Sequence, residues 1–213
     1  MNLILFGPPG AGKGTQSQHL AKRFGYFQVS TGDLLRNEIK NNTDLGKKIS
    51  NKINNGEFVE DKIVNLLVEK TITNKNIEKK IIFDGYPRNI SQAKNLDNIL
   101  LKNNQVLSSI IYLDVPRDII QKRILGRLIC EKCNKTLNEF LDIEEIEKHR
   151  CGKNYLKKRN DDKLDTIMKR YDTFIKETNP LLEYYSKRTS FFKINGSLKI
   201  GEITAKIEEI INA

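Results

Sequence analysis

The sequence predicts an α/β fold in which helices flank a parallel sheet. Short apolar runs of strand length recur along the 213 residues, at 3–6, 27–29, 81–83, 110–113 and 191–194. Longer segments with the apolar spacing of a helix separate them, at 15–24, 61–71, 91–102, 117–126 and 166–186. Because right-handed crossovers join strands that alternate with helices, the predicted strands run parallel and helices cover both faces.

The first predicted strand, residues 3–6, ends in the glycine-rich segment GPPGAGKGT at residues 7–15, and a predicted helix follows. Such a turn directs backbone N–H groups and the positive end of the helix dipole at one place, which suits a polyphosphate. Lys13 adds a mobile positive charge for the β and γ phosphate oxygens of a nucleotide. The segment is therefore interpreted as a nucleotide site.

One position departs from the phosphate-binding pattern G-x-x-x-x-G-K-[ST]. Gly14 stands where the pattern has a hydroxyl that ligates magnesium, and Thr15 comes one residue later. Magnesium keeps several waters readily, so two phosphate groups and those waters can hold the ion, with a carboxylate bonded to the waters. Asp84 is placed for this role because it follows the predicted strand 81–83.

Two segments interrupt the alternation of strands and helices. Residues 30–60 are predicted to be mostly helical, whereas residues 127–163 contain the cysteines and little apolar periodicity. We interpret both as insertions at the carboxyl edge of the parallel sheet, where ligands bind in folds of this class.

The charge balance favours an anionic partner. Lys and Arg number 37 against 27 Asp and Glu, which gives a net charge of +10 and allows nucleic acid, an anionic surface or a polyanionic small substrate. Part of the excess reflects a composition rich in Asn, Ile and Lys. No apolar run approaches the roughly 18 to 20 residues that cross a bilayer, and no signal segment is evident. We therefore expect a soluble cytoplasmic protein with no membrane partner.

Motifs along nearly the whole chain together resemble the adenylate kinase family. They are GPPGAGKGT (7–15), STGDLLR (30–36), DGYPR (84–88) with Gln92, RILGR (123–127), and RNDD (159–162) with Arg170. In that family the loop also reads G-K-G-T, so Gly14 is a family feature. The resemblance implies a P-loop NTPase-like parallel sheet with two mobile inserted subdomains, and a monomer.

The resemblance also implies the reaction, a reversible magnesium-dependent phosphoryl transfer from ATP to AMP that gives two ADP. Catalysis would rest on positioning and arginine charge, without a general base. The implied ATP-binding residues are Gly10, Ala11, Gly12, Lys13, Gly14, Thr15, Arg123 and Arg127. The implied AMP-binding residues are Thr31, Arg36, Glu57, Val59, Gly85, Arg88, Gln92, Arg159 and Arg170. The implied catalytic residues are Lys13, Arg88, Arg123, Arg127, Arg159 and Arg170. Asp33 and Asp84 would orient the waters of magnesium.

The resemblance also implies that the chain divides into a core and two inserted parts. The core would comprise 1–29, 60–123 and 164–213, residues 30–59 would form an AMP-binding insert, and residues 124–163 a lid. Because transfer to water has to be prevented, the insert and the lid are expected to close over the bound nucleotides.

The three cysteines all lie in the predicted lid, and their odd number argues against a disulfide framework. Cys130 and Cys133 have the C-x-x-C spacing of structural zinc sites. Zinc-bearing members of the resembled family repeat this pair, but here only Cys151 follows, with His149 two residues before it. The expected zinc ligands are Cys130, Cys133, His149 and Cys151. Asn154 or water is the alternative to His149, and inert cysteines are the alternative to a metal.

Two other functions fit parts of the sequence. A UMP/CMP-type kinase would share much of the site, although Thr31 and Gln92 favour adenine because an amide offers both a donor and an acceptor to a purine edge. A nucleic-acid-binding module would use the cysteine segment, but Phe140 and Tyr155 are isolated and the acidic stretch 142–147 would repel a phosphate backbone. We therefore expect ATP, AMP and ADP as partners, and no nucleic acid.

Overall fold

The structure, a computed structural model, describes residues 1–73, 80–159 and 162–212. Its centre is a five-stranded parallel sheet in the order β2-β3-β1-β4-β8. The strands are β1 (Asn2–Phe6), β2 (Phe27–Ser30), β3 (Ile81–Asp84), β4 (Leu107–Asp114) and β8 (Phe191–Asn195). Each apolar run found in the sequence lies in one of them, which confirms the predicted α/β class with its parallel sheet.

The sheet is covered on both faces, and β1 shows how the sequence encodes this. All five residues of β1 are buried. Successive side chains point to opposite faces, so Ile4 and Phe6 lie in one apolar cluster while Leu3 and Leu5 lie in another. A strand packed on both sides needs apolar residues on both faces, which explains the continuous apolar run at 3–6; the buried Asn2 accepts a hydrogen bond from the backbone N–H of Ile81.

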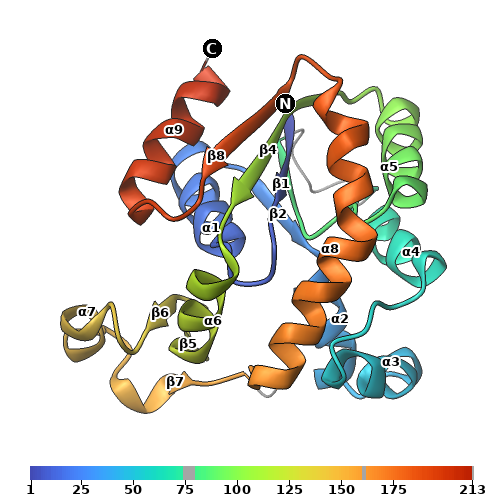
Figure 1. Cartoon of the computed structure of the whole chain (residues 1–213). Helices are drawn as coiled ribbons and strands as arrows, with labels where there is room; N and C mark the ends of the chain where they lie inside the picture. The colour runs from blue at the N-terminus through green and yellow to red at the C-terminus, as the bar shows by residue number, and fades with distance from the viewer. Residues whose placement is uncertain (74–79, 160–161, 213) are drawn as a thin grey trace.

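Helices cover both faces of the sheet (Figure 1), and they and the other strands supply most of the remaining residues of both clusters. The helices of the core are α1 (Lys13–Phe24), α4 (Asp61–Ile72), α5 (Ile90–Lys102), α6 (Arg117–Leu125), α8 (Leu164–Ser186) and α9 (Ile200–Asn212). Five of them were predicted within two residues at each end. The sequence analysis missed α9, although Ile203, Ile207 and Ile211 recur every four residues and are all buried. None of the helices in the described part of the chain has the length and apolarity needed to cross a membrane.

The first insertion is helical, as predicted, and begins where β2 ends. It contains α2 (Thr31–Lys40) and α3 (Asp44–Asn54). The Ser30 side chain caps α2 by accepting from the backbone N–H of Asp33. The two helices cross closely at Gly46, where a Cβ atom would lie 2.1 Å from the backbone oxygen of Glu38, so only glycine fits there.

The second insertion contains a small antiparallel sheet that its weak periodicity did not predict. Its strands are β5 (Arg127–Cys130), β6 (Thr136–Asn138) and β7 (Leu156–Lys157), in the order β6-β5-β7, with the short helices α7 (Ile143–Glu147) and η1 (Lys153–Tyr155). Strands of two to four residues are too short to show a period of two. Figure 1 shows both insertions beyond the carboxyl ends of β1 and β4, at the predicted edge of the sheet.

Candidate nucleotide site and metal cluster

The glycine-rich segment forms a tight turn between β1 and α1. Gly12 is the N-cap of α1 with φ +94°, and no side chain caps this helix. Gly10 has φ +82°, and a Cβ there would lie 2.6 Å from Cγ1 of Ile124 on α6. Both positions therefore require glycine. The uncapped first turn of α1 leaves backbone N–H groups for an anionic ligand, as the sequence predicted.

Lys13, the first residue of α1, turns back over this loop. Its ammonium group donates hydrogen bonds to the backbone oxygens of Gly7 at 2.7 Å and Pro8 at 3.0 Å. Burial is the largest of the effects that lower its pKa to about 8, and Asp84 opposes them. Among the described residues, two neutral carbonyl groups thus hold this ammonium, and one carboxylate lies nearby.

Three of the predicted arginines surround this lysine. The charges of Arg88, Arg170 and Arg127 all lower the pKa of Lys13. Burial lowers the pKa of Arg88 itself to about 10, and the charge of Arg170 adds to that effect. These cations come from α1, β5, α8 and the segment after β3. Within the described part of the chain, Asp84 is the one carboxylate whose charge contributes to the pKa shift of Lys13. A polyphosphate would supply the negative charge that this group needs.

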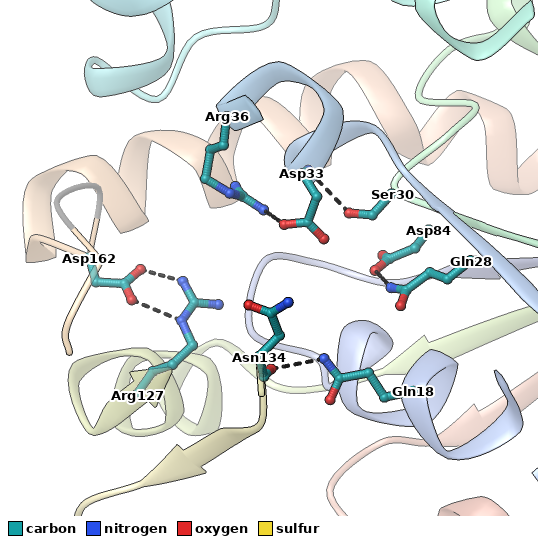
Figure 2. Close-up of polar contacts among 9 residues, drawn as sticks. All are labelled: Gln18, Gln28, Ser30, Asp33, Arg36, Asp84, Arg127, Asn134 and Asp162. Carbon is teal, nitrogen blue, oxygen red and sulfur yellow. Dashed lines mark hydrogen bonds and ion pairs between the residues drawn. The ribbon is translucent and has the colours of Figure 1, made fainter. Parts of the chain in front are cut away.

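Two carboxylates, Asp84 and Asp33, lie near one another and near this group of cations, and Figure 2 draws both with their hydrogen-bond partners. Asp84 is the last residue of β3, which extends one residue further than the predicted strand 81–83, and it accepts a hydrogen bond from Nε2 of Gln28 at 3.0 Å. Burial raises its pKa, with a smaller contribution from Asp33. A Cβ at Gly14 would lie 3.7 Å from Oδ2 of Asp84, so the missing side chain leaves space next to this carboxylate. Hard oxygen donors of this kind fit the hydrated magnesium ion expected here.

Asp33 lies on α2 and forms an ion pair with Arg36 at 2.6 Å. Burial acts to raise the pKa of Asp33, but Arg36, the Ser30 hydroxyl and Arg159 together bring it below its ordinary value. The structure therefore places Arg36 and Arg159 near Asp33. Of the RNDD motif, Asn160 and Asp161 lie outside the described residues.

The predicted AMP-binding residues after β3 are joined by hydrogen bonds. The backbone oxygen of Gly85 accepts from Oγ1 of Thr31 and from Nε of Arg88, both at 2.8 Å. The backbone N–H of Arg88 donates to Oε1 of Gln92 at 2.8 Å. The Arg88 guanidinium also lies 4.8 Å from the ring centre of Phe58. Sequence reasoning missed Phe58, although it stands between two predicted residues.

The end of the first insertion packs on α8. Glu57 is exposed and forms an ion pair with Lys169 at 3.1 Å, and Val59 is buried in the core. A Cβ at Gly56 would come within 2.8 Å of Cγ of Arg170. The structure thus brings the predicted residues 57 and 59 to the helix that carries Arg170.

An ion pair joins the two ends of the second insertion. Arg127 binds both carboxylate oxygens of Asp162, with Nε to Oδ2 at 2.8 Å, and the Asp162 side chain is only 1% exposed (Figure 2). Asp162 belongs to the RNDD motif, but no role was predicted for it from the sequence. Arg123 has a different setting on α6, where burial lowers its pKa and its backbone oxygen accepts from Nδ2 of Asn138 at 3.0 Å.

The predicted metal ligands form a cluster. The ligand atoms of Cys130, Cys133, His149 and Cys151 all lie within 4.8 Å of one another. Burial acts to raise the pKa of Cys130, but hydrogen bonds from His149 and from backbone N–H groups bring it to about 6, which favours the thiolate that binds metal. Three sulfurs and one imidazole nitrogen suit tetrahedral zinc, so the cluster fits a structural zinc site that leaves no position open for catalysis.

We expect the purified protein to contain one zinc ion per chain, and His149→Ala to lose most of it. Without the ion the cysteine thiolates repel one another and the small sheet loses its main cross-link, so the melting temperature should fall by about 5 °C or more. Elemental analysis and calorimetry measure both quantities. His19→Ala, at an exposed histidine of α1, is the matched control. Full zinc content in His149→Ala would exclude His149 as a ligand.

The comparisons with known proteins agree with this geometry. The family model described as "Adenylate kinase" matches residues 5–190. A protein named adenylate kinase from Pelagibacter ubique (strain HTCC1062) is 55% identical over 99% of this chain and 99% of its own length. Proteins of the same name from Listeria monocytogenes serotype 4a (strain HCC23) and Thermotoga neapolitana are 36% and 37% identical, and each alignment covers at least 96% of both chains. The chain therefore belongs to the adenylate kinase family.

Proposed function

We infer that this chain catalyses the reversible, magnesium-dependent transfer of a phosphoryl group from ATP to AMP, which gives two ADP. The observation that carries this conclusion is the convergence of Arg88, Arg127 and Arg170 on Lys13 at the glycine turn. Phosphoryl transfer needs little covalent participation by the protein, because the transition state is stabilised by in-line positioning and by cations around the transferred group.

In this proposal the glycine turn binds the donor nucleotide. Backbone N–H groups of the turn, residues 10–15, contact the phosphates of ATP, and Lys13 leaves the carbonyls of Gly7 and Pro8 to bind the β and γ oxygens. Arg123 stacks on the adenine of ATP. Arg127 binds the donor phosphates from the start of the lid, where Asp162 orients its guanidinium.

The acceptor nucleotide occupies the space between α2 and the segment after β3. Arg36 and Arg88 bind the phosphate of AMP, since planar guanidinium groups match phosphate oxygens with two parallel hydrogen bonds. Gln92 reads the adenine edge. Thr31, Gly85 and the backbone at 57 and 59 complete the adenine pocket.

During transfer, Lys13, Arg88, Arg127, Arg159 and Arg170 offset the charge on the moving phosphoryl group. Magnesium, when bound, would neutralise part of the charge of the donor phosphates. Asp33 and Asp84 would hold the waters of that ion through their carboxylate oxygens. The terminal phosphate oxygen of AMP is already an anion, so no side chain has to remove a proton from it.

The division into core, AMP insert (30–59) and lid (124–163) is part of the same proposal. The insert packs on α8 near Arg170, and the lid contacts α1 through a hydrogen bond from Nε2 of Gln18 to the Asn134 backbone oxygen at 3.0 Å. Closure of both over bound nucleotides would keep water from the transferred group.

Because every proposed site residue comes from a single chain, we propose that the monomer is active. The reduced cysteines suit the cytoplasm.

The proposal includes no nucleic-acid partner. The ammonium of Lys132 lies 3.9 Å from the ring centre of Tyr155, so this aromatic face is already occupied. Helix α7 presents the carboxylates of Glu144, Glu145 and Glu147 on the same insertion. These carboxylates pair with Lys135, Lys148 and Lys153, so the lysines offer little free charge to a phosphate backbone. Stacking platforms for bases also need exposed aromatic faces.

The acceptor preference tests the proposed function. With ATP as donor, we expect kcat/KM for AMP to exceed the values for CMP, UMP and GMP by about 10²-fold or more, because a site built to hydrogen-bond one base leaves buried polar groups unpaired with another. A coupled assay of ADP formation measures these rates, and ATP without acceptor gives the hydrolysis background. A higher kcat/KM for CMP or UMP would contradict the proposal.

A further inference from the structure

Asp61 opens α4, directly after the AMP insert, and its carboxylate faces the start of α5. Oδ1 of Asp61 accepts a hydrogen bond from Nε2 of Gln92 at 2.6 Å. Both carboxylate oxygens also accept from Nδ2 of Asn89, at 3.0 and 3.1 Å. Asn89 in turn caps α5 through its Oδ1, which accepts from the backbone N–H of Gln92 at 2.9 Å. Asp61 thus holds both the cap of α5 and the amide of Gln92.

These contacts determine which way the Gln92 amide points. Gln92 is only 2% exposed. Its Oε1 accepts from the backbone N–H of Arg88 at 2.8 Å, and its Nε2 donates to Asp61. A backbone N–H can only donate and a carboxylate can only accept, so a rotation of the amide by 180° would place donor against donor and acceptor against acceptor. Only one orientation satisfies both neighbours.

The orientation of this amide matters for base recognition. An amide has two N–H donors and two acceptor lone pairs, so one donor and one acceptor are left after the bonds to Asp61 and Arg88. A 6-aminopurine offers an acceptor at N1 and a donor at its amino group. A 6-oxopurine offers the reverse, a donor at N1 and an acceptor at the 6-oxygen. The two orientations of a glutamine amide therefore match these two classes of base.

We propose that Asp61 is a positioning residue that fixes the Gln92 amide in the orientation for 6-aminopurines and so makes the acceptor site reject 6-oxopurine monophosphates. This inference rests on the proposed function, because it assumes that Gln92 reads the acceptor base. Asp61 itself does not touch the nucleotide. Its carboxylate acts by excluding the rotated amide, which a neutral group able to donate as well as accept would tolerate.

The test compares AMP with IMP, which differ at position 6 of the purine. In Asp61→Asn the new amide can accept from Nε2 or donate to Oε1 of Gln92, so Asp61 no longer excludes the rotated amide and only the backbone N–H of Arg88 still opposes it. We expect the ratio of kcat/KM for AMP to that for IMP to fall about 10-fold or more, while KM for ATP stays within about twofold. Asp61→Ser can also donate or accept and carries the same expectation, so failure of one variant to fold does not leave the test undecided.

Three further variants separate the possible outcomes. Glu60→Gln makes the same change at the neighbouring carboxylate, which pairs with Lys52 and lies 69% exposed, and should leave the ratio unchanged. Gln92→Ala should lower the ratio, and adding Asp61→Asn to it should cause no further loss. If Gln92→Ala lowers the ratio but Asp61→Asn and Asp61→Ser do not, Asp61 has no such role. If Gln92→Ala leaves the ratio unchanged, the assignment of Gln92 in the proposed function is wrong and this inference fails with it.

Discussion

Lys13→Met is expected to lower kcat by about 10³-fold while leaving the fold intact, because the proposed mechanism places this cation against the transferred phosphate in the transition state. Methionine has a similar length and no charge, so the change isolates the ammonium group. The contacts that Lys13 makes without ligand are partly buried hydrogen bonds to the carbonyls of Gly7 and Pro8. We therefore expect the melting temperature to match or exceed that of the unchanged protein, since a partly buried charge is removed.

The pH dependence of ATP binding gives a second readout of the same side chain. The pKa of Lys13 is lowered to about 8, chiefly by burial, so the ammonium is fully charged below pH 8 and loses its proton above it. A bound polyphosphate favours the charged form, so ATP affinity should be constant below pH 8 and fall as pH rises through that value. In Lys13→Met this decline should be absent.

Lys22→Met is the matched control, because Lys22 lies exposed in the last turn of the same helix α1. Its kcat and its pH profile for ATP binding should stay within about twofold of those of the unchanged protein, as expected for an exposed charge away from the site. Turnover in Lys13→Met within tenfold of the unchanged protein would contradict the role given to the glycine turn.

The sequence predicted those parts of the molecule that depend on local pattern. The continuous apolar run of β1 indicated a strand packed on both faces, and the glycines that follow it indicated the turn that Gly10 and Gly12 form. The C-x-x-C spacing of Cys130 and Cys133 predicted the metal-ligand cluster. In each case the residues that form the feature are neighbours in the chain, or recur with the period of one secondary structure.

The residues that hold the site in shape were not predictable in this way. Gln28 bonds to Asp84, 56 positions further on, and Asp61 bonds to Gln92, 31 positions further on. No helical or strand period relates such pairs. A lone glutamine or aspartate also has many possible roles at the surface. The fold alone brings these side chains together, at the ends of parallel strands and helices that are distant in sequence.

Arg88→Lys keeps the formal charge and is nevertheless expected to lower kcat/KM for AMP by about 10²-fold or more, since a lysine cannot make the paired bonds of a guanidinium to phosphate. The change also removes the hydrogen bond from Nε to the Gly85 backbone oxygen and the contact with the ring of Phe58. Steady-state rates at varied AMP and ATP should show a raised KM for AMP and a lowered kcat, with KM for ATP little altered.

The loss of kcat/KM for AMP in Arg88→Lys should become larger as the pH rises. Burial and the neighbouring Arg170 lower the pKa of Arg88 to about 10, well below the ordinary value of an arginine. Lysine has a lower ordinary pKa than arginine, about 10.4, so the same surroundings would lower it further and leave less of the side chain charged as pH rises. Arg23→Lys, at an arginine 68% exposed and paired with Glu208, is the control and should change kcat/KM less than about twofold. An unchanged kcat/KM for AMP in Arg88→Lys would show that a point charge at this position suffices. It would contradict the proposed pair of hydrogen bonds from Arg88 to the acceptor phosphate.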